Sequence, residues 1–202
     1  MQRNPTYCGQ LQTMPGVNYH QLLKDCIKKK PEAQRDLYDH FAPSMLGVCF
    51  RYTKNLDDAE NILQDGFVKV FKNLQQFKAE GELGAWIRRI MVNTALTYLK
   101  TNRKYRHELL FEETPLHRVS TEDPEVKLHT KEIAEMIRQL PTGFQTVFNL
   151  HAIEGYSHVE IGSMLGISDG TSRSQYSRAR ALLIEWMEKS SLKEKGGHYG
   201  RK

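Results

Sequence analysis

The amino-acid sequence predicts an all-α protein with two small helical domains joined by a flexible acidic linker. Apolar residues recur every three or four positions in two long stretches, and no segment shows the alternation typical of a strand. Between these stretches the periodicity fades into a Glu- and Asp-rich segment that Pro115 and Pro124 interrupt. The expected divisions are a flexible leader at 1–17, domains at 18–101 and 128–189, a linker at 102–127 and a disordered tail at 190–202.

The first domain is expected to begin with two helices. The first spans residues 19–29 and ends at a run of three lysines. The second spans about 32–53, and Pro43 within it indicates a kink or break, because proline cannot donate a helical hydrogen bond. Apolar residues at helical spacing are expected on its inner side: Leu37, Phe41, Met45, Val48 and Tyr52.

Two further helices are expected in the same domain. Asn55 is placed to cap the third, and acidic residues in its first turn suit the positive end of the helix dipole. A loop over 78–84 separates this helix from the fourth, at about 85–101. The apolar positions of the two helices are Ile62, Leu63, Phe67, Val70, Phe71 and Leu74 in the third and Trp86, Ile87, Ile90 and Leu99 in the fourth.

The second domain carries the most informative pattern of the chain, at residues 154–180. Ser157 and Glu160 have the spacing of a capping box, and Gly166 follows the short helix where a left-handed residue ends it most easily. Ser168 or Asp169 can cap the helix that follows, which is rich in Arg, Ser and Gln. This pattern predicts a helix-turn-helix whose second helix enters the major groove of DNA.

The second helix of this motif provides the candidate DNA contacts. Tyr176, Ala179, Leu182 and Leu183 are expected to face the core. Arg pairs with guanine edges, Gln with adenine, and Ser with bases or phosphates, so the side chains expected on the exposed N-terminal half are suited to DNA. They are Ser172, Arg173, Ser174, Gln175, Ser177 and Arg178, while Arg180 is either a phosphate contact or a surface charge. The alternative is an ordinary helical hairpin with a polar outer face.

The bulk composition agrees with a polyanion-binding protein. The net charge is +5 and the isoelectric point is about 9.0. No run of about 18 apolar residues and no secretory segment is visible, so a cytoplasmic protein without a membrane span is expected, starting at Met1 or Met14. Cys8, Cys26 and Cys49 lack the spacing of zinc ligands or a disulfide framework. Neither metal nor cofactor is expected.

Both halves of the chain resemble one protein family. The segment from Asp57 to Leu74 resembles the most characteristic helix of bacterial sigma factors, and Phe77 to Ala95 resembles the promoter-melting segment that follows it. The helix-turn-helix resembles the domain that recognises the −35 element. The resemblance covers about residues 19–187 and matches the extracytoplasmic-function (ECF) group, in which only the second and fourth sigma domains remain. It implies a specificity subunit that binds core RNA polymerase, recognises −10 and −35 elements and promotes DNA melting, without catalysis of its own.

The resemblance also implies roles for residues of the first domain. The polymerase-binding residues would be Asp57, Glu60, Gln64 and Asp65, unless they form only a solvated helix face. Phe67, Val70 and Phe71 are expected in the core rather than at an interface.

A second set of residues would handle the −10 element. Glycines allow close approach of an unpaired base, an Asn side chain offers a donor and an acceptor to it, and basic side chains hold phosphates. The residues are Lys78, Gly81, Gly84, Arg88, Arg89 and Asn93. Asn93 can instead bond a neighbouring helix, the arginines can be solvated only, and Trp86 is expected to be buried rather than to stack on a base. The segment has fewer aromatic residues than primary sigma factors, which indicates weaker intrinsic melting.

The resemblance also implies a role for the linker. In this family the linker threads the polymerase cleft, where its carboxylates would mimic nucleic acid and alter abortive initiation. The alternative is that the linker is only a solvated tether. The linker carboxylates are Glu108, Glu112, Glu113, Glu122, Asp123 and Glu125. The resemblance further implies a partner protein, an anti-sigma factor that clamps both domains.

Two other classes of function fit the sequence less well. A self-sufficient transcription regulator needs a receiver or ligand-binding domain, and no alternation of strands and helices is visible. An enzyme needs a catalytic constellation, and there is no HExxH motif, phosphate-binding loop or nucleophile elbow. The eight histidines are scattered along the chain.

Overall fold

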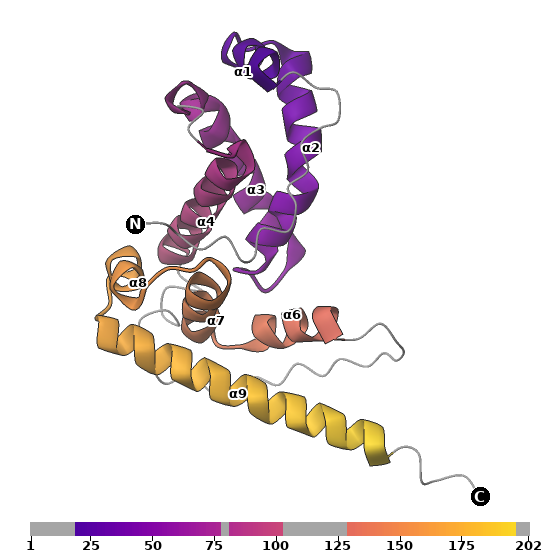
Figure 1. Cartoon of the computed structure of the whole chain (residues 1–202), viewed down its shortest axis with the longest axis vertical. Helices are drawn as coiled ribbons and strands as arrows, with labels where there is room; N and C mark the ends of the chain where they lie inside the picture. The colour runs from indigo at the N-terminus through magenta and orange to yellow at the C-terminus, as the bar shows by residue number, and fades with distance from the viewer. Residues whose placement is uncertain (1–18, 78–80, 103–128, 197–202) are drawn as a thin grey trace, which may run out of the picture. The chain divides into compact units, whose positions relative to one another are not determined.

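A computed structural model describes residues 19–77, 81–102 and 129–196 (Figure 1). Every regular element in these ranges is helical, which confirms the predicted all-α fold. The chain divides into two compact units, with the boundary between Tyr98 and Leu99. The predicted leader and most of the predicted linker lie outside the described residues.

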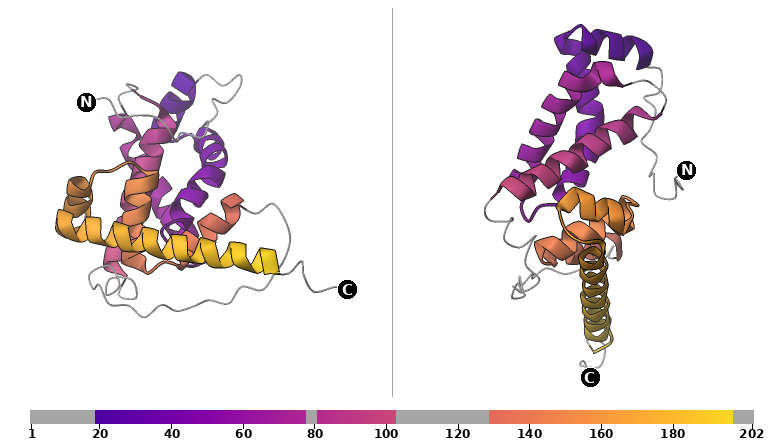
Figure 2. Two further views of the ribbon diagram at one scale, coloured as in Figure 1. Left: turned by 60° about the horizontal axis from the view of Figure 1, so that its bottom comes forward. Right: turned by 90° about the vertical axis from the view of Figure 1, so that its left-hand side faces the viewer.

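The first unit contains four α-helices and a short 3-10 turn. They are α1 (Tyr19–Ile27), α2 (Pro31–Phe50), α3 (Leu56–Asn73), η1 (Leu74–Gln76) and α4 (Leu83–Thr101). α2 packs along α3, and α1 contacts both α2 and η1 (Figures 1 and 2). The predicted inner residues of α2 are buried: Leu37, Phe41, Met45, Val48 and Tyr52.

Two expectations for this unit need correction. The helix α2 continues through Pro43 without a break, because buried residues on both sides of the proline, among them Phe41 and Met45, hold the helix in the core. The helix α4 begins at Leu83 rather than at about residue 85, so Gly84 lies in its first turn and is buried. Leu83 is also buried, and its packing extends the helix toward the loop.

A small polar network holds the start of α3. The side chain of Asn55 accepts a 2.8 Å hydrogen bond from the backbone N–H of Asp58, which confirms the predicted cap. Asn55 also donates to the Asp58 carboxylate at 3.0 Å, and the Tyr98 hydroxyl donates to the other carboxylate oxygen at 2.6 Å. The network therefore ties α4 to the N-terminus of α3.

The side chain of Met91 in α4 packs onto Gly66 of α3. A methyl group placed on Gly66 would lie 2.2 Å from the sulfur of Met91, a fully buried residue of α4. The Lys69 ammonium donates to the Thr94 hydroxyl at 3.1 Å one turn further along. Gly66 therefore leaves the space that the buried Met91 side chain fills.

Two glycine substitutions in this unit should have opposite effects on stability. Gly66→Ala should lower the free energy of unfolding by about 1 kcal/mol, since the displaced Met91 side chain costs more than the gain in helix propensity. Gly47→Ala should raise it by about 0.5–1 kcal/mol, because no atom lies within 4 Å of the added methyl group. Urea unfolding of both variants measures the difference, and equal shifts would refute the packing of Met91 on Gly66.

The second unit contains α6 (His129–Gln139), α7 (Thr142–Phe148), a π-helical segment η2 (Asn149–Ile153), α8 (His158–Leu165) and α9 (Asp169–Gly196). One core cluster centres on Ile137, Leu140, Ala179 and Leu183. Helix α9 packs against α6, α7 and α8 and extends past them toward the C-terminus (Figures 1 and 2).

The C-terminal end of α9 differs from expectation. The helix continues beyond residue 189 to Gly196, where the sequence had indicated a disordered tail. The segment 190–195 contains no proline or glycine, so nothing ends the helix before Gly196.

The start and end of α8 and the start of α9 have the caps that the sequence predicts. Ser157 and Glu160 form a complete capping box, and Gly166 has φ 76° and ψ 35°. The Ser168 hydroxyl accepts a 2.9 Å hydrogen bond from the N–H of Thr171, so Ser168 rather than Asp169 caps α9. Local chemistry therefore fixes both helix ends around the turn.

Candidate polymerase and nucleic-acid interfaces

The N-terminal half of α9 presents only part of the predicted DNA-contacting set. Arg173, Ser177 and Arg178 are exposed and Ser174 is half-buried. Ser172 and Gln175 are 0% and 2% exposed, so the expectation that they lie on the outer surface is wrong. They precede Ala179 by seven and four residues, and at 100° per residue this spacing places them on the same inward face.

A cluster of ring side chains stabilises the inner side of this helix. His158 Nδ1 and the Ser172 hydroxyl share a 2.9 Å hydrogen bond. The rings of His151 and His158 stack at 4.2 Å, and Tyr176 packs edge-on against His151 at 4.6 Å. His151 Nδ1 donates to the Tyr156 carbonyl at 2.8 Å, because a carbonyl can only accept. This cluster, which the scattered histidines of the sequence did not indicate, connects α8 and η2 to α9.

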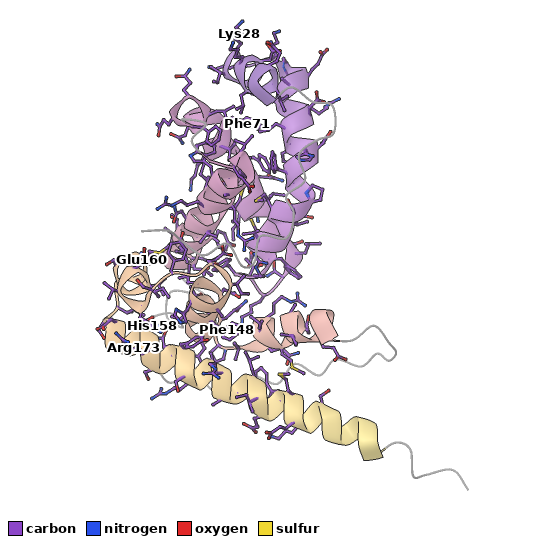
Figure 3. The ribbon with its side chains drawn as sticks, in the orientation of Figure 1. Lys28, Phe71, Phe148, His158, Glu160 and Arg173 are labelled. Carbon is purple, nitrogen blue, oxygen red and sulfur yellow. The ribbon has the colours of Figure 1, made fainter. Side chains whose placement is uncertain are left out.

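The electrostatics around His158 favour its neutral form. Burial lowers the pKa of the His158 imidazole, the nearby His151 and Arg173 lower it further, and Asp169 opposes them. His158 and Arg173 lie near the turn between α8 and α9 (Figure 3). Arg173 also donates to Asp169 at 3.1 Å, which lowers the pKa of that carboxyl.

The second unit should therefore lose stability in mild acid. In the unfolded chain His158 has a pKa near 6.5, so below that pH the unfolded state binds a proton that the folded state resists. Stability then falls as pH drops below about 6.5. Urea unfolding between about pH 7.5 and 5.5 should show this fall, and His158→Gln should reduce it. An unchanged pH dependence in the variant would contradict the role of His158.

The exposed face of α3 carries the predicted polymerase-binding residues. Asp57, Glu60, Gln64 and Asp65 are all exposed, and Val68 continues the same face with 50% exposure. The buried residues of the helix face α2 and α4, including Phe67 and Val70, whereas Phe71 is half-buried.

A groove of about 480 Å³ lies between α2 and α3 beside this face. Ala42, Pro43, Leu46 and Leu63 form its apolar part, and Tyr38, Asp39, Glu60 and Gln64 also line it. The sequence had indicated Pro43 only as a helix breaker and had not indicated Asp39 at all. The groove therefore combines an apolar floor with two carboxylates.

The predicted −10 residues divide into an exposed strip and buried positions. Arg89 and Asn93 are exposed one turn apart on α4, and Ala85 and Thr97 extend the strip in both directions. Arg88 is half-buried and interacts with a neighbouring group. Gly81 is exposed with open space around it, Gly84 is buried, and Lys78 lies outside the described residues.

An aromatic pair closes the base of the loop that precedes α4. The rings of Phe77 and Trp86 lie 5.5 Å apart, with 51° between their planes. Both side chains are half-buried. Trp86 therefore packs against Phe77 but is only half-buried, so its expected burial is met in part.

The two cysteines described in the first unit are buried, free thiols. Cys26 and Cys49 are 2% and 0% exposed, and burial raises the pKa of Cys26 to about 11 and of Cys49 to about 12. Cys26 donates to the Ala33 carbonyl at 3.1 Å. Within the described ranges, no three His, Cys, Asp or Glu side chains gather as metal ligands, and no helix has the length and apolarity needed to cross a membrane.

Comparison with known proteins identifies the family of the chain. Residues 37–105 match the family described as sigma-70 region 2, and residues 130–183 match sigma-70 region 4. Together the two matches cover more than half of the chain. The chain belongs to the ECF group of the sigma-70 family, and its function is that of an RNA polymerase sigma factor.

The matches with individual relatives cover different shares of this chain and of each relative. The chain is 32% identical over 162 residues to the ECF RNA polymerase sigma factor SigE of Mycolicibacterium smegmatis, covering 77% of this chain but only 62% of that protein. It is 28% identical over 171 residues to the RNA polymerase sigma factor YlaC of Bacillus subtilis, covering 83% of this chain and 99% of that protein. A solved structure of the sigma factor RpoE in complex with the anti-sigma factor NepR from Bartonella quintana matches with 20% identity and a TM-score of 0.48, covering 76% of this chain and 96% of that one.

Proposed function

We propose that this sigma factor divides promoter recognition between its two units and binds core RNA polymerase through α3. The observation that carries the proposal is the recognition helix α9, whose inner face is fixed by packing while its outer face presents Arg173, Ser177 and Arg178. A helix held in this way offers rigid donors to the edges of intact base pairs.

The outer face of α9 recognises the −35 element. Two arginines and two serines, at positions 173, 174, 177 and 178, supply donors for guanine edges and phosphates. Arg173 is oriented by Asp169, so its guanidinium is partly preorganised before DNA arrives. Arg180 lies 5.9 Å from the Tyr176 ring, and we assign it to the phosphate backbone.

The exposed strip of α4 binds the separated strand of the −10 element. Asn93 offers a donor and an acceptor to an unpaired base, and Arg89 holds the adjacent phosphate. Gly81 lets the backbone of the preceding loop approach the same base. The buried Gly84 contributes through helix packing, so we remove it from the contacting set.

The acidic face of α3 and the adjoining groove bind the polymerase. Asp57, Glu60 and Asp65 complement a basic partner helix, and the exposed Val68 adds an apolar contact. The groove beside Glu60 accepts an apolar side chain of that helix. Glu60 lines the groove from α3, and Asp39 lines it from α2. Gln64 belongs to both surfaces.

The chain has no catalytic activity of its own and works in the cytoplasm as a subunit of the polymerase. Family membership implies one further partner, an anti-sigma factor that covers the polymerase-binding surface of α3. The role of the linker carboxylates in abortive initiation stays a prediction, since the linker lies outside the described residues.

Run-off transcription tests the proposed function. Core polymerase is incubated with a library of genomic fragments, with and without the purified chain. We expect new transcripts whose start sites share upstream −10 and −35 sequences. The proposal fails if the chain does not bind core polymerase or if no chain-dependent start site is found.

A further inference from the structure

The turn between α1 and α2 carries three consecutive exposed lysines, Lys28, Lys29 and Lys30. We call these residues the lysine turn. The N–H of Lys30 bonds the carbonyl of Asp25 at 3.1 Å, and the N–H of Lys29 bonds the carbonyl of Cys26 at 2.9 Å. These two bonds form a Schellman motif, which fixes the backbone of the lysine turn.

Lys29 occupies an unfavourable conformation in this motif. Its φ is 58°, and among the described residues no other non-glycine residue has a positive φ. Glycine is the usual residue at this position, because a side chain is strained in the left-handed region. Folding alone therefore favours glycine at position 29, and the lysine requires another explanation.

The charges of the lysine turn are only partly neutralised within the protein. Lys30 forms a 2.8 Å ion pair with Asp25. Over the described ranges, the side chains of Lys28 and Lys29 form no ion pair or hydrogen bond. Both side chains are exposed, and Lys28 is labelled at the end of the first unit in Figure 3.

The position of the lysine turn relates it to the −10 surface. Helix α1, which ends in the lysine turn, packs against η1. The segment η1 leads directly through Phe77 into the loop that precedes α4. The lysine turn thus follows a helix that packs beside η1, the segment from which the chain continues toward α4.

We propose that Lys28 and Lys29 bind backbone phosphates of promoter DNA next to the −10 element. The inference rests on the proposed function, and it adds a sequence-independent contact to the base contacts of α4. Phosphates fit because the unneutralised groups are two adjacent ammonium ions, which bind phosphate as point charges. A contact of this kind strengthens holoenzyme binding on every promoter without changing promoter choice.

The salt dependence of promoter binding tests this contact. Holoenzyme containing Lys28→Gln/Lys29→Gln is titrated onto a promoter fragment found by run-off transcription, at several salt concentrations. Losing two phosphate contacts should reduce the slope of log K against log salt by about 1.4–1.8 and weaken binding at ~0.1 M salt at least about fivefold. The charge-retaining control Lys28→Arg/Lys29→Arg should bind as the unaltered chain does.

A second variant separates DNA binding from folding. Lys29→Gly removes one charge and the backbone strain together, so it should raise the melting temperature of the first unit by about 2–5 °C while reducing the salt slope by about 0.7–0.9. A lysine with only a structural role would leave the slope unchanged.

Three outcomes would overturn the inference or its basis. An unaltered slope in the Gln variants removes the phosphate contact while leaving the proposed function intact. A loss of core polymerase binding in those variants assigns the lysine turn to the polymerase instead. Failure of the unaltered chain to direct transcription from any promoter would refute the proposed function itself.

Discussion

Gly162→Ala is expected to destabilise the second unit and to weaken recognition of the −35 element. A methyl group on Gly162 would lie 2.8 Å from the carbonyl oxygen of Ile167 and 3.5 Å from the backbone nitrogen of Asp169. Both atoms belong to the turn backbone, which cannot rotate away as a side chain can. The same turn is held by hydrogen bonds from the N–H groups of Gly166 and Ile167 to the carbonyl of Gly162, at 2.8 and 3.1 Å.

The expected net loss is about 2 kcal/mol, because overpacking against rigid backbone costs the upper end of about 1–3 kcal/mol and helix propensity returns about 1 kcal/mol. Gly162→Val adds two more methyl groups and should prevent formation of the helix-turn-helix. Urea unfolding of the second unit and binding of a −35 duplex measure the effect.

Ser163→Ala is the matched control on the same helix. Ser163 is exposed, and its hydroxyl donates only to the Val159 carbonyl within α8, at 3.2 Å. This variant should unfold within about 0.5 kcal/mol of the unaltered chain, as surface substitutions usually do. If Gly162→Ala behaved in the same way, the close packing of α8 on the turn would be incorrect.

Arg173→Ala is expected to weaken promoter binding by about 5- to 150-fold, since a bidentate base contact contributes about 1–3 kcal/mol of discrimination. The loss should be accompanied by reduced preference for the native −35 element. Stability should change little, because the Arg173–Asp169 ion pair is exposed and such pairs contribute about 0–1 kcal/mol. Run-off transcription from matched and −35-mutated templates measures both the loss and the preference.

Lys189→Ala is the control for this substitution. Lys189 lies on the same helix and pairs with Glu185 four residues earlier, as Arg173 pairs with Asp169. It lies far along α9 from the turn, so its removal should leave transcription unchanged. Arg173→Lys separates two roles, because lysine keeps a phosphate contact but lacks the planar fork for guanine. If Arg173→Ala transcribed each of the two templates as well as the unaltered chain does, Arg173 would be excluded as a contact to the −35 element.

Much of the fold could be predicted because short-range chemistry determines it. The Asn55 cap, the Ser157–Glu160 capping box and the left-handed Gly166 each depend on residues within four positions. The continuous course of α2 through Pro43 could not be predicted, because it depends on how the residues on both sides of the proline pack in the core. The packing at Gly66 likewise depends on Met91 of another helix.

The candidate site was predicted less completely than the fold. Residue type identified the polar stretch of α9, but the inward position of Ser172 and Gln175 follows from extending the spacing of Ala179 and Leu183 back by two turns. The contact of His158 with Ser172 joins residues fourteen positions apart, which no local pattern indicates. The groove at Asp39 depends on how α2 and α3 pack, so the sequence alone could not reveal it.

The burial of Ser172 and Gln175 limits how this protein can acquire a new promoter preference. On the proposed assignment, only Arg173, Ser174, Ser177 and Arg178 can be exchanged without disturbing the interior of the unit. Retargeting the factor to a foreign promoter should therefore need a library of four randomised codons. Randomising the two inward codons as well would mainly add clones that fail to fold.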